Sequence, residues 1–284
     1  MFTLILENER GDQVPITNTG SYSLSEIDGL NPPSAVINTS EGMFDGEKFN
    51  SSKMEMRTIL ISVDINSPAE ENRLNFYKVG RPKQYIKLHY KNNTRKVFIE
   101  GYVESVKVDY MAMKQNATIS ILCPEPYFKD AKELIHEINL VLNQFYFAFA
   151  SEEEPSICFG VIRENLETEL INTGEVETGM VITIEAKDET NGIKIFDKFT
   201  GEFIGVNFFM RQGDTIIITT NVGNKTVRLF RNGNYTNIFN NLMKNITWLQ
   251  LKTGINQYAI ETGDGKAPEH LELKFEFANK YGGV

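Results

Sequence analysis

Between residues 55 and 123 the chain alternates apolar and polar side chains at every second position over several segments. Successive side chains of a β-strand point to opposite faces of a sheet, so this period of two predicts strands that bury one face. The apolar positions are Ile59, Ile61, Val63 and Ile65 in one segment and Ile86, Leu88 and Tyr90 in another. Half-buried strands of this kind are typical of antiparallel sheets, and they make the chain mainly β.

The alternation changes phase within residues 97–110. Apolar side chains fall on odd positions at first, at Val97 and Ile99, and on even positions later, at Val106 and Val108. A phase change around a glycine predicts a β-bulge or a sharp bend near Gly101.

The strand series ends in 117–128, ATISILCPEPYF. One face of this last strand is made by Ile119, Ile121 and Cys123. Because Pro124 and Pro126 cannot continue the ladder, we expect Cys123 to be a core residue at a strand end, followed by the exit from a domain. Cys158 is also expected to be a small buried residue, since the two cysteines form no CxxC motif that would indicate a zinc site.

Two segments carry helix signals. In 67–82, Ser67 can cap a helix in which Pro68 takes the first position, Glu70 completes a capping box, and Gly80 stops it. In 130–145 an apolar stripe at helical spacing predicts a second helix. Its members are Leu134, Ile138, Val141, Leu142 and Phe145, with His136 off the stripe and expected in solvent.

The second half of the sequence returns to strands. Alternating segments at 180–186, 193–210 and 215–235 are joined by turn signals such as Asn232-Gly233, which predicts an antiparallel β-sandwich. Residues 131–189 hold three basic against 13 acidic residues. The expected organisation is a β-rich domain at 1–130, a helical and acidic connector at 131–155, and a sandwich domain at 156–284.

Motifs for chemistry are missing from the sequence. It has no GxSxG, HExxH, P-loop or GxGxxG arrangement, and His89, His136 and His270 stand apart, so we expect neither catalytic residues nor a bound metal or cofactor. A net charge of -9 argues against nucleic-acid binding. The sequence shows no signal peptide and no apolar run of about 20 residues, so we expect a soluble protein made in the cytoplasm, with no membrane partner.

Three alternatives stay open at this point. A glycosidase needs only two carboxylates, which an acidic chain cannot exclude. The loop 261–270 holds Glu261, Asp264 and Glu269 in an arrangement that invites calcium, although it lacks the EF-hand spacing and a plain hairpin loop is favoured. Trp248, at the start of an expected strand, and Tyr235 would stack on a saccharide if their rings faced solvent.

Three blocks resemble the distal tail proteins of phages with long, non-contractile tails. The first is 99–128, with GYVES followed by ISILCPEPYF, and the second is 172–185, with NTGEVETG. The third is 246–265, with W..L, taken together with the terminal KYGGV at 280–284. The resemblance extends over nearly the whole chain except 130–154.

The resemblance implies an N-terminal β-sandwich-like belt domain with a short helix, and a C-terminal galectin-like antiparallel β-sandwich. It implies a homo-hexameric ring in the virion tail, made in the cytoplasm of the bacterial host. Its implied partners are the tail tube protein, the tail-tip or tail-associated protein, and the receptor-binding proteins. The implied role is structural, as a hub, and the alternative is a module that binds host cell-wall saccharide.

Overall fold

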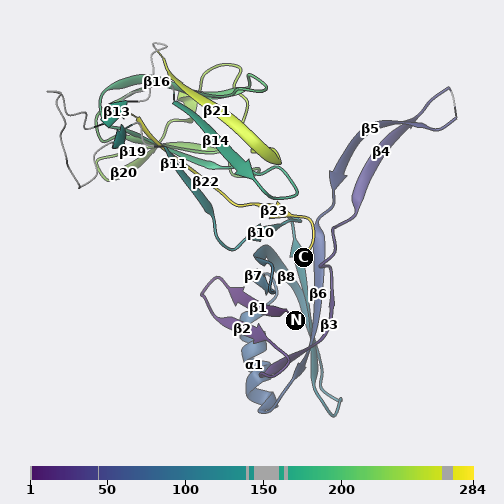
Figure 1. The fold of residues 1–284 in the computed structure, drawn as a ribbon. Helices are drawn as coiled ribbons and strands as arrows, with labels where there is room; N and C mark the ends of the chain where they lie inside the picture. The colour runs from purple at the N-terminus through teal and green to yellow at the C-terminus, as the bar shows by residue number, and fades with distance from the viewer. Residues whose placement is uncertain (1, 44, 139–140, 144–159, 163–165, 264–270) are drawn as a thin grey trace, which may run out of the picture. The chain divides into compact units, whose positions relative to one another are not determined.

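The computed structural model describes the chain except residues 1, 44, 139–140, 144–159, 163–165 and 264–270. The chain divides into two compact units (Figure 1). Unit 1 comprises Met1–Lys132 together with Lys280–Val284, and unit 2 comprises Glu133–Asn279. Unit 2 is therefore inserted near the C-terminal end of unit 1, and the last residues return to the first unit.

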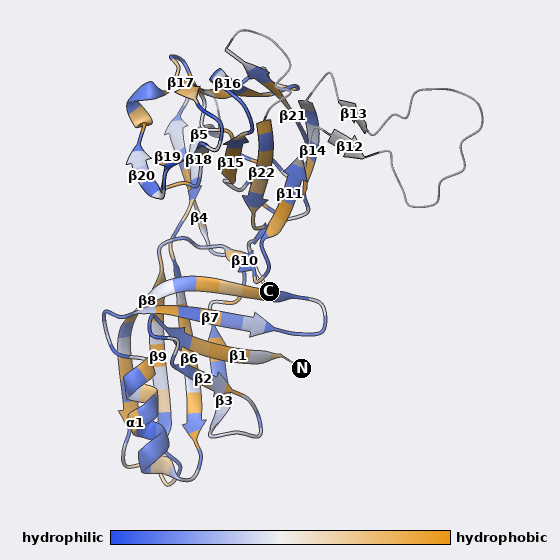
Figure 2. Ribbon diagram, turned by 90° about the vertical axis from the view of Figure 1, so that its left-hand side faces the viewer, coloured by the Kyte–Doolittle hydropathy of each residue, from blue (hydrophilic) through white to orange (hydrophobic). Residues whose placement is uncertain are grey.

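Unit 1 is built on one antiparallel sheet with the strand order β2-β1-β7-β8-β9-β6-β3. These strands are β1 (Thr3–Asn8), β2 (Gln13–Ile16), β3 (Tyr22–Asp28), β6 (Arg57–Ile65), β7 (Tyr85–Lys91), β8 (Lys96–Asp109) and β9 (Asn116–Cys123). Figure 2 shows apolar and polar residues alternating along them. Every apolar position predicted from the alternation in β6 and β7 is buried, which confirms the core face.

Three further strand pairings complete unit 1. The short strands β10 (Phe128–Asp130) and β23 (Lys280–Tyr281) pair with each other, and β10 also pairs with β8. Strands β4 (Ala35–Glu41) and β5 (Glu47–Met54) form a separate two-stranded sheet. In the chain they follow β3 and precede β6. We call this hairpin, residues 35–54, the arm.

The helix α1 (Ala69–Val79) confirms the first helix prediction and buries Phe76 and Val79. Its start differs from the expectation, because Pro68 is the N-cap and no side chain caps the helix. Ser67 and Glu70 therefore form no capping box. The C-cap is Gly80, as predicted, and its backbone N–H donates to the carbonyl of Phe76.

The bulge in β8 lies slightly downstream of its predicted position. The register against β9 shifts between Val103 and Ser105, while Gly101 itself is regularly paired with β7. Gly101 serves close strand packing instead, because an added Cβ would lie 2.6 Å from the carbonyl oxygen of Leu122. The phase change in the sequence thus located the irregularity to within a few residues.

Unit 2 is a β-sandwich of two antiparallel sheets. The six-stranded sheet has the order β11-β22-β15-β18-β19-β20 and the four-stranded sheet the order β14-β21-β16-β17. Their core is shared: Tyr258 of β21 stacks on Phe275 of β22, with ring centroids 6.3 Å apart. The bounds are β11 (Leu134–Ile138), β14 (Leu166–Asn172), β15 (Val181–Ala186), β16 (Thr190–Asp197), β17 (Phe203–Met210), β18 (Thr215–Thr219), β19 (Thr226–Arg231), β20 (Asn234–Asn237), β21 (Gly254–Thr262) and β22 (Leu271–Phe277), with a 3-10 turn η1 (Phe239–Asn241).

The helix predicted at 130–145 is wrong. Residues 134–138 form the edge strand β11, which pairs with β22 from Leu134 opposite Phe277 onward. Residues 141–143 form β12 (Val141–Asn143), paired with β13 (Gly160–Ile162). Pairing with an existing sheet edge satisfies the backbone of β11, and the β-branched Ile135 and Ile138 suit a strand better than a helix. Residues 144–145 lie outside the described part.

The loop 261–270 is not the plain hairpin loop that was expected. The strands on either side of it, β21 and β22, belong to different sheets of the sandwich. The segment therefore crosses from one sheet to the other. Asp264 and Glu269 lie outside the described residues, so the calcium interpretation stays untested.

Candidate assembly surfaces

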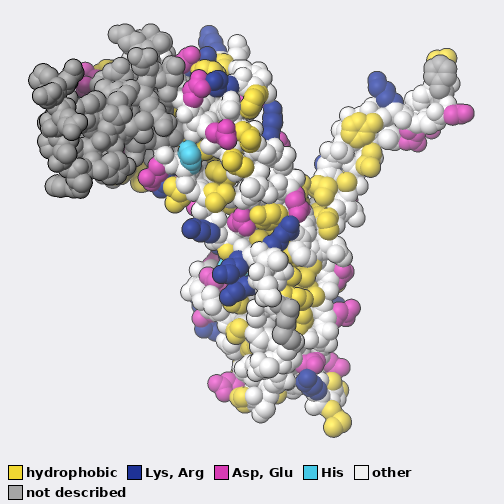
Figure 3. All heavy atoms as spheres, in the orientation of Figure 1, with side chains coloured by type: hydrophobic (Ala, Val, Ile, Leu, Met, Phe, Trp, Pro, Cys, Tyr) yellow, Lys and Arg dark blue, Asp and Glu magenta, His cyan; other side chains and the backbone are white. Residues whose placement is uncertain are grey.

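The arm exposes large apolar side chains. Ile37 of β4 is 62% exposed and Phe49 of β5 is 60% exposed, and Met43 at the tip is 99% exposed. Figure 3 shows hydrophobic side chains at the surface along the projecting hairpin. A two-stranded hairpin is only marginally stable alone in water, and exposed apolar patches mark interaction sites. The arm thus has the properties of a segment that binds another protein surface.

A second apolar surface lies on the sheet face of unit 1 that is opposite the core. Tyr102 of β8 pairs with Leu122 of β9, which pairs with Thr58 of β6, so the three side chains share one row. Leu60, two residues from Thr58, is on the same face and 42% exposed, while Tyr102 is 51% exposed. We call Leu60, Tyr102 and Leu122 the outer patch. An open sheet face with aromatic and aliphatic side chains is suited to protein contacts.

The turn between β8 and β9 carries a third exposed apolar group. Met111 and Met113 are fully exposed, and Tyr110 is 57% exposed. The base of this turn is held to α1 by a hydrogen bond of 2.7 Å between the hydroxyls of Tyr77 and Tyr110. The guanidinium of Arg73 also lies 5.0 Å from the centre of the Tyr110 ring. A fixed base with flexible methionines above it is a form that adaptable binding surfaces take.

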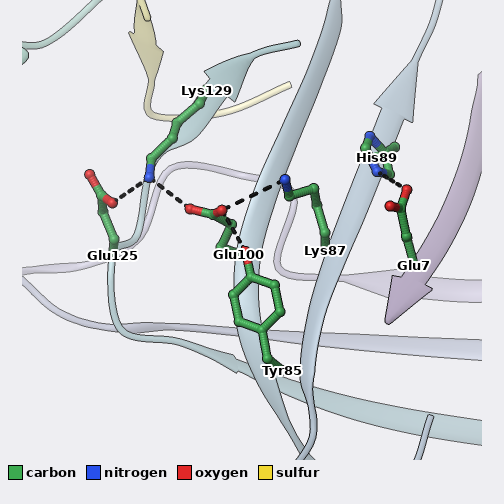
Figure 4. A network of polar contacts seen from close by, with 7 residues as sticks. All are labelled: Glu7, Tyr85, Lys87, His89, Glu100, Glu125 and Lys129. Atoms are coloured by element: carbon green, nitrogen blue, oxygen red, sulfur yellow. Dashed lines mark hydrogen bonds and ion pairs between the residues drawn. The ribbon is translucent and has the colours of Figure 1, made fainter. Parts of the chain in front are cut away.

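A polar cluster fixes the place where the chain leaves unit 1 and returns to it (Figure 4). Lys129 of β10 forms ion pairs with Glu125 at 2.7 Å and with Glu100 of β8 at 2.9 Å. Glu125 also pairs with Lys280 of β23 at 2.7 Å, and Tyr85 donates its hydroxyl to Glu100. The cluster therefore joins the outgoing strand β10 and the returning strand β23 to the main sheet.

The protonation states of this cluster follow from its contacts. Burial alone raises the pKa of Glu100, but the hydrogen bonds from Tyr85 and Lys129 outweigh it and hold that pKa below its usual range. Glu125 behaves in the same way: burial raises its pKa, and the bonds from Lys129 and Lys280 lower it further than burial raises it. Both carboxylates are therefore charged at neutral pH.

Cys123 is a core residue, as predicted. It is fully buried at the end of β9, opposite Arg57 of β6. Burial raises the pKa of its thiol to about 12, and the charge of Arg57 offsets only part of that effect. Because the thiolate is the reactive form, Cys123 is inert in the folded protein. Cys158 lies outside the described residues.

The two aromatic residues considered for saccharide stacking differ in exposure. Trp248 is half-buried outside any strand, packs against the core of unit 2, and stacks on Phe239 with ring centroids 5.7 Å apart. The ammonium of Lys225 lies 5.5 Å from the Trp248 ring. Tyr235, on the edge strand β20, is 64% exposed and tilts against Phe230. Saccharide binding by these two residues stays a prediction.

Among the described residues, no group of three or more His, Cys, Asp or Glu side chains could hold a metal ion. His89 lies 3.0 Å from a carboxylate oxygen of Glu7, and His136 lies 3.0 Å from the hydroxyl of Thr168. His270 is outside the described part. No helix found in the described residues is both long and apolar enough to cross a membrane.

Comparison with known proteins identifies the second half of the chain. Residues 173–281 match the family described as siphovirus-type tail component, C-terminal domain. The match includes residues 173–185 of the second block and, from the third, residues 246–265 with the first two residues of the terminal KYGGV.

The likeness to tail proteins extends over the whole fold. The chain superposes on the SPP1 Dit protein, described as a paradigm of the hub adsorption apparatus in phages that infect Gram-positive bacteria, with a TM-score of 0.68. The two are 13% identical, and the match covers 99% of each chain. A chain of the phage P2 baseplate in its activated conformation with Ca gives a TM-score of 0.55 at 12% identity, covering 100% of both. A search of curated proteins gave no match.

These matches confirm the resemblance to the distal tail family and the mainly β fold with a sandwich. Sequence reasoning missed the arm and left open whether the C-terminal residues 276–284 return to the first unit, to which the last five belong. A signal for the arm was present in 35–54, where Gly42, Asp45 and Gly46 interrupt a stretch of strand-forming residues. No short-range pattern announces the return of the tail, because it depends on contacts between residues far apart in the sequence.

Proposed function

We propose that this chain is a structural component of a phage tail, in which copies of it form a hexameric ring that joins the tail tube to the tail tip. The observation that carries the proposal is the similarity of fold over 99% of both chains to the SPP1 hub protein. The tail component domain at 173–281 supports the same role. The partners of the ring are the tail tube protein on one side and the tail-tip and receptor-binding proteins on the other.

Unit 1 has surfaces that suit ring formation. A ring of identical subunits needs two different patches on each copy, one of which binds the other on the next copy. The arm, with Ile37 and Phe49, and the outer patch, with Leu60 and Tyr102, are two such surfaces on one unit. We propose that unit 1 provides the ring contacts and that unit 2 carries the tail component domain.

The arm gives the sharpest test of this proposal. Fully burying an exposed Ile or Phe contributes about 1.5–3 kcal/mol, so the part of Ile37 and Phe49 still exposed is worth about 1–2 kcal/mol each. The double variant Ile37→Ser and Phe49→Ser should therefore weaken each subunit contact by about 2–4 kcal/mol, roughly 30- to 1000-fold in the dissociation constant.

The measurement is the mass of the full chain by light scattering, followed by negative-stain images. We expect six copies of a 32.3 kDa chain in an open ring for the wild type and smaller species for the arm variant. The control is Phe199→Ser with Ile255→Ser, which removes similarly exposed side chains, at 66% and 57%, from unit 2. A chain that stays monomeric even with its tail tube and tail-tip partners would overturn the ring.

Saccharide binding by unit 2 is a second candidate function, compatible with the first. The observation in its favour is Tyr235, a largely exposed aromatic ring on an edge strand whose four residues are all exposed. Titration with host cell-wall polysaccharide tests it, with Tyr235→Ala as the variant that should lose binding. No binding by the wild type would leave unit 2 as a scaffold.

A further inference from the structure

Arg57 is the most deeply buried cation among the described residues with several partners. Arg57 is the first residue of β6, the strand that follows the arm in the chain, and it is 3% exposed. The guanidinium lies over the ring of Phe128, 4.7 Å from the ring centre. Its Nε donates to the carbonyl of Pro126 at 2.9 Å, its Nη1 to the carbonyl of Gly29 at 2.8 Å, and its Nη2 to the carbonyl of Gly282.

The three acceptors belong to three segments that connect unit 1 to different parts of the chain. Gly29 follows β3 and begins the strand connection into the arm. Pro126 precedes β10, through which the chain leaves for unit 2, and Gly282 follows β23, through which it returns. The three nitrogens of one rigid guanidinium thus donate one hydrogen bond each to the root of the arm and to both connections to unit 2. We call Arg57 with these three carbonyls the Arg57 joint.

A second set of contacts holds the tail against the root of the arm. The backbone N–H of Val284 donates to the carbonyl of Leu30 at 3.3 Å. Gly283 lies so close to Pro32 that an added Cβ would be 2.9 Å from the proline ring. Arg95 donates from Nη1 to the carbonyl of Gly283 at 2.8 Å. The last three residues therefore pack on residues 29–32, the segment that enters the arm.

The energetics of a buried cation couple these segments. A buried N–H that loses its acceptor incurs the full desolvation penalty, whereas a bond that is exchanged with water costs little. Withdrawal of Gly282 would leave part of the guanidinium buried and unpaired, so the group would move and weaken its bonds to Gly29 and Pro126. Coupling of this kind acts equally in both directions.

We propose that the Arg57 joint couples the arm to the connection of unit 2, so that loosening either one loosens the other. In the assembled tail, a partner that binds the arm would thereby hold the strands β10 and β23 that carry unit 2. Only this last consequence rests on the proposed function. The coupling itself is a property of the single chain and can be tested there.

Hydrogen exchange of the full chain, measured by mass spectrometry, reports both directions of the coupling. The first variant ends at Tyr281 and lacks the last three residues, none of which lies in a strand. We expect amides in 29–34 and 127–131 to exchange about tenfold faster, because local opening costs less free energy once these contacts are lost. Amides of β7 and of β15 in unit 2 should keep their wild-type rates.

The reverse direction uses a pair of matched glycines. Gly29 has a φ of +89° and an added Cβ would overlap the carbonyl of Thr58, whereas Gly46 at the arm tip has a φ of +96° with open space around it. Both alanine variants therefore impose the strain of a positive φ, and Gly29→Ala alone adds a steric overlap at the joint. We expect Gly29→Ala to speed exchange at residues 280–284, and Gly46→Ala to leave those rates unchanged.

The outcomes decide the proposal whether or not a ring forms. Wild-type exchange at 29–34 in the truncated chain would overturn it, even if Gly29→Ala failed to fold. Equal exchange at 280–284 in the two alanine variants would overturn it as well. If the coupling holds while the chain never forms a ring, the joint is retained and only its assembly role is lost.

Discussion

Replacing Gly101 with alanine tests whether close strand packing explains this glycine. It lies in β8 beside the end of β9, and its φ is not positive, so alanine can adopt its backbone conformation. The added Cβ would be 2.6 Å from the carbonyl oxygen of Leu122, 2.8 Å from Cγ2 of Ile121 and 2.9 Å from Sγ of Cys123. These neighbours are one backbone atom and two core side chains, which have little room to move.

The expected magnitude follows from two opposing effects. At a position that accepts it without strain, Gly→Ala stabilises a protein by about 0.4–1 kcal/mol, because the unfolded chain has fewer conformations. Forcing an extra methyl group into a packed core costs about 1–3 kcal/mol. We expect the second effect to win, with a net loss of about 1–2 kcal/mol from the free energy of unfolding of unit 1.

The assay must separate the two units, and the sequence provides a probe for one of them. Trp248 is the single tryptophan and lies in unit 2, so its fluorescence in urea follows unit 2 alone. Far-UV circular dichroism follows both units. We expect Gly101→Ala to move the circular dichroism transition of unit 1 to lower urea while the Trp248 transition stays in place.

Gly20→Ala is the matched control in unit 1. There the added Cβ meets only the hydroxyl oxygen of Thr17, a side chain that can rotate away. We expect it to be neutral or slightly stabilising. If Gly101→Ala also raised the stability of unit 1, the close approach of β8 and β9 would not be the reason for a glycine at this position.

The polar cluster predicts a loss of stability in acid. Because the pKa of Glu100 is lowered in the folded chain, its contribution is present above its unfolded pKa of about 4.3 and is lost as the pH falls through the folded value. Glu100→Gln should reduce the unfolding free energy of unit 1 by about 1 kcal/mol at pH 7, a value that allows for the partial exposure of Glu100. The loss should be smaller at pH 3. Equal losses at both pH values would refute the linkage. A second prediction concerns Cys123. In a Cys158→Ser background, Cys123 should react with a thiol reagent only at urea concentrations that unfold unit 1, and rapid labelling of the native chain would contradict its burial.

The strands of unit 1 were predictable because each one carries its own signal. In β6 and β7 the core face is marked by every second residue, and a one-residue slip would expose all of these side chains to water. The resulting penalty fixes the face and the register from local sequence alone. The same argument placed the end of β9 correctly, since the prolines after Cys123 cannot take part in a ladder.

The predictions failed where local sequence supports two structures. The stripe in 130–145 fits helical spacing, yet Leu134, His136 and Ile138 also fit the alternation of a strand, and pairing with β22 decides between them. The start of α1 failed for a related reason, because Pro68 itself takes the N-cap position that was assigned to Ser67. For residues 134–138 the deciding information lies outside the segment, in the pairing with β22.

The candidate surfaces were harder to predict than the core. Burial leaves a periodic pattern in the sequence, whereas an exposed apolar residue such as Phe49 or Tyr102 looks the same as a residue of a buried face. The Arg57 joint has no local signature either, because its acceptors are 28, 69 and 225 positions away along the chain. Contacts of this separation are read only from the fold.

The insertion of unit 2 would allow this unit to change in size while unit 1 keeps its structure. Its two connections run side by side, since β10 and β23 pair with each other. A domain whose ends lie together can change in size without separating the strands of its host. The contacts that hold these ends, from Arg57 and from Glu125, belong entirely to unit 1. We therefore expect the attachment to tolerate changes in unit 2, and to loosen when the three residues after Tyr281 are removed.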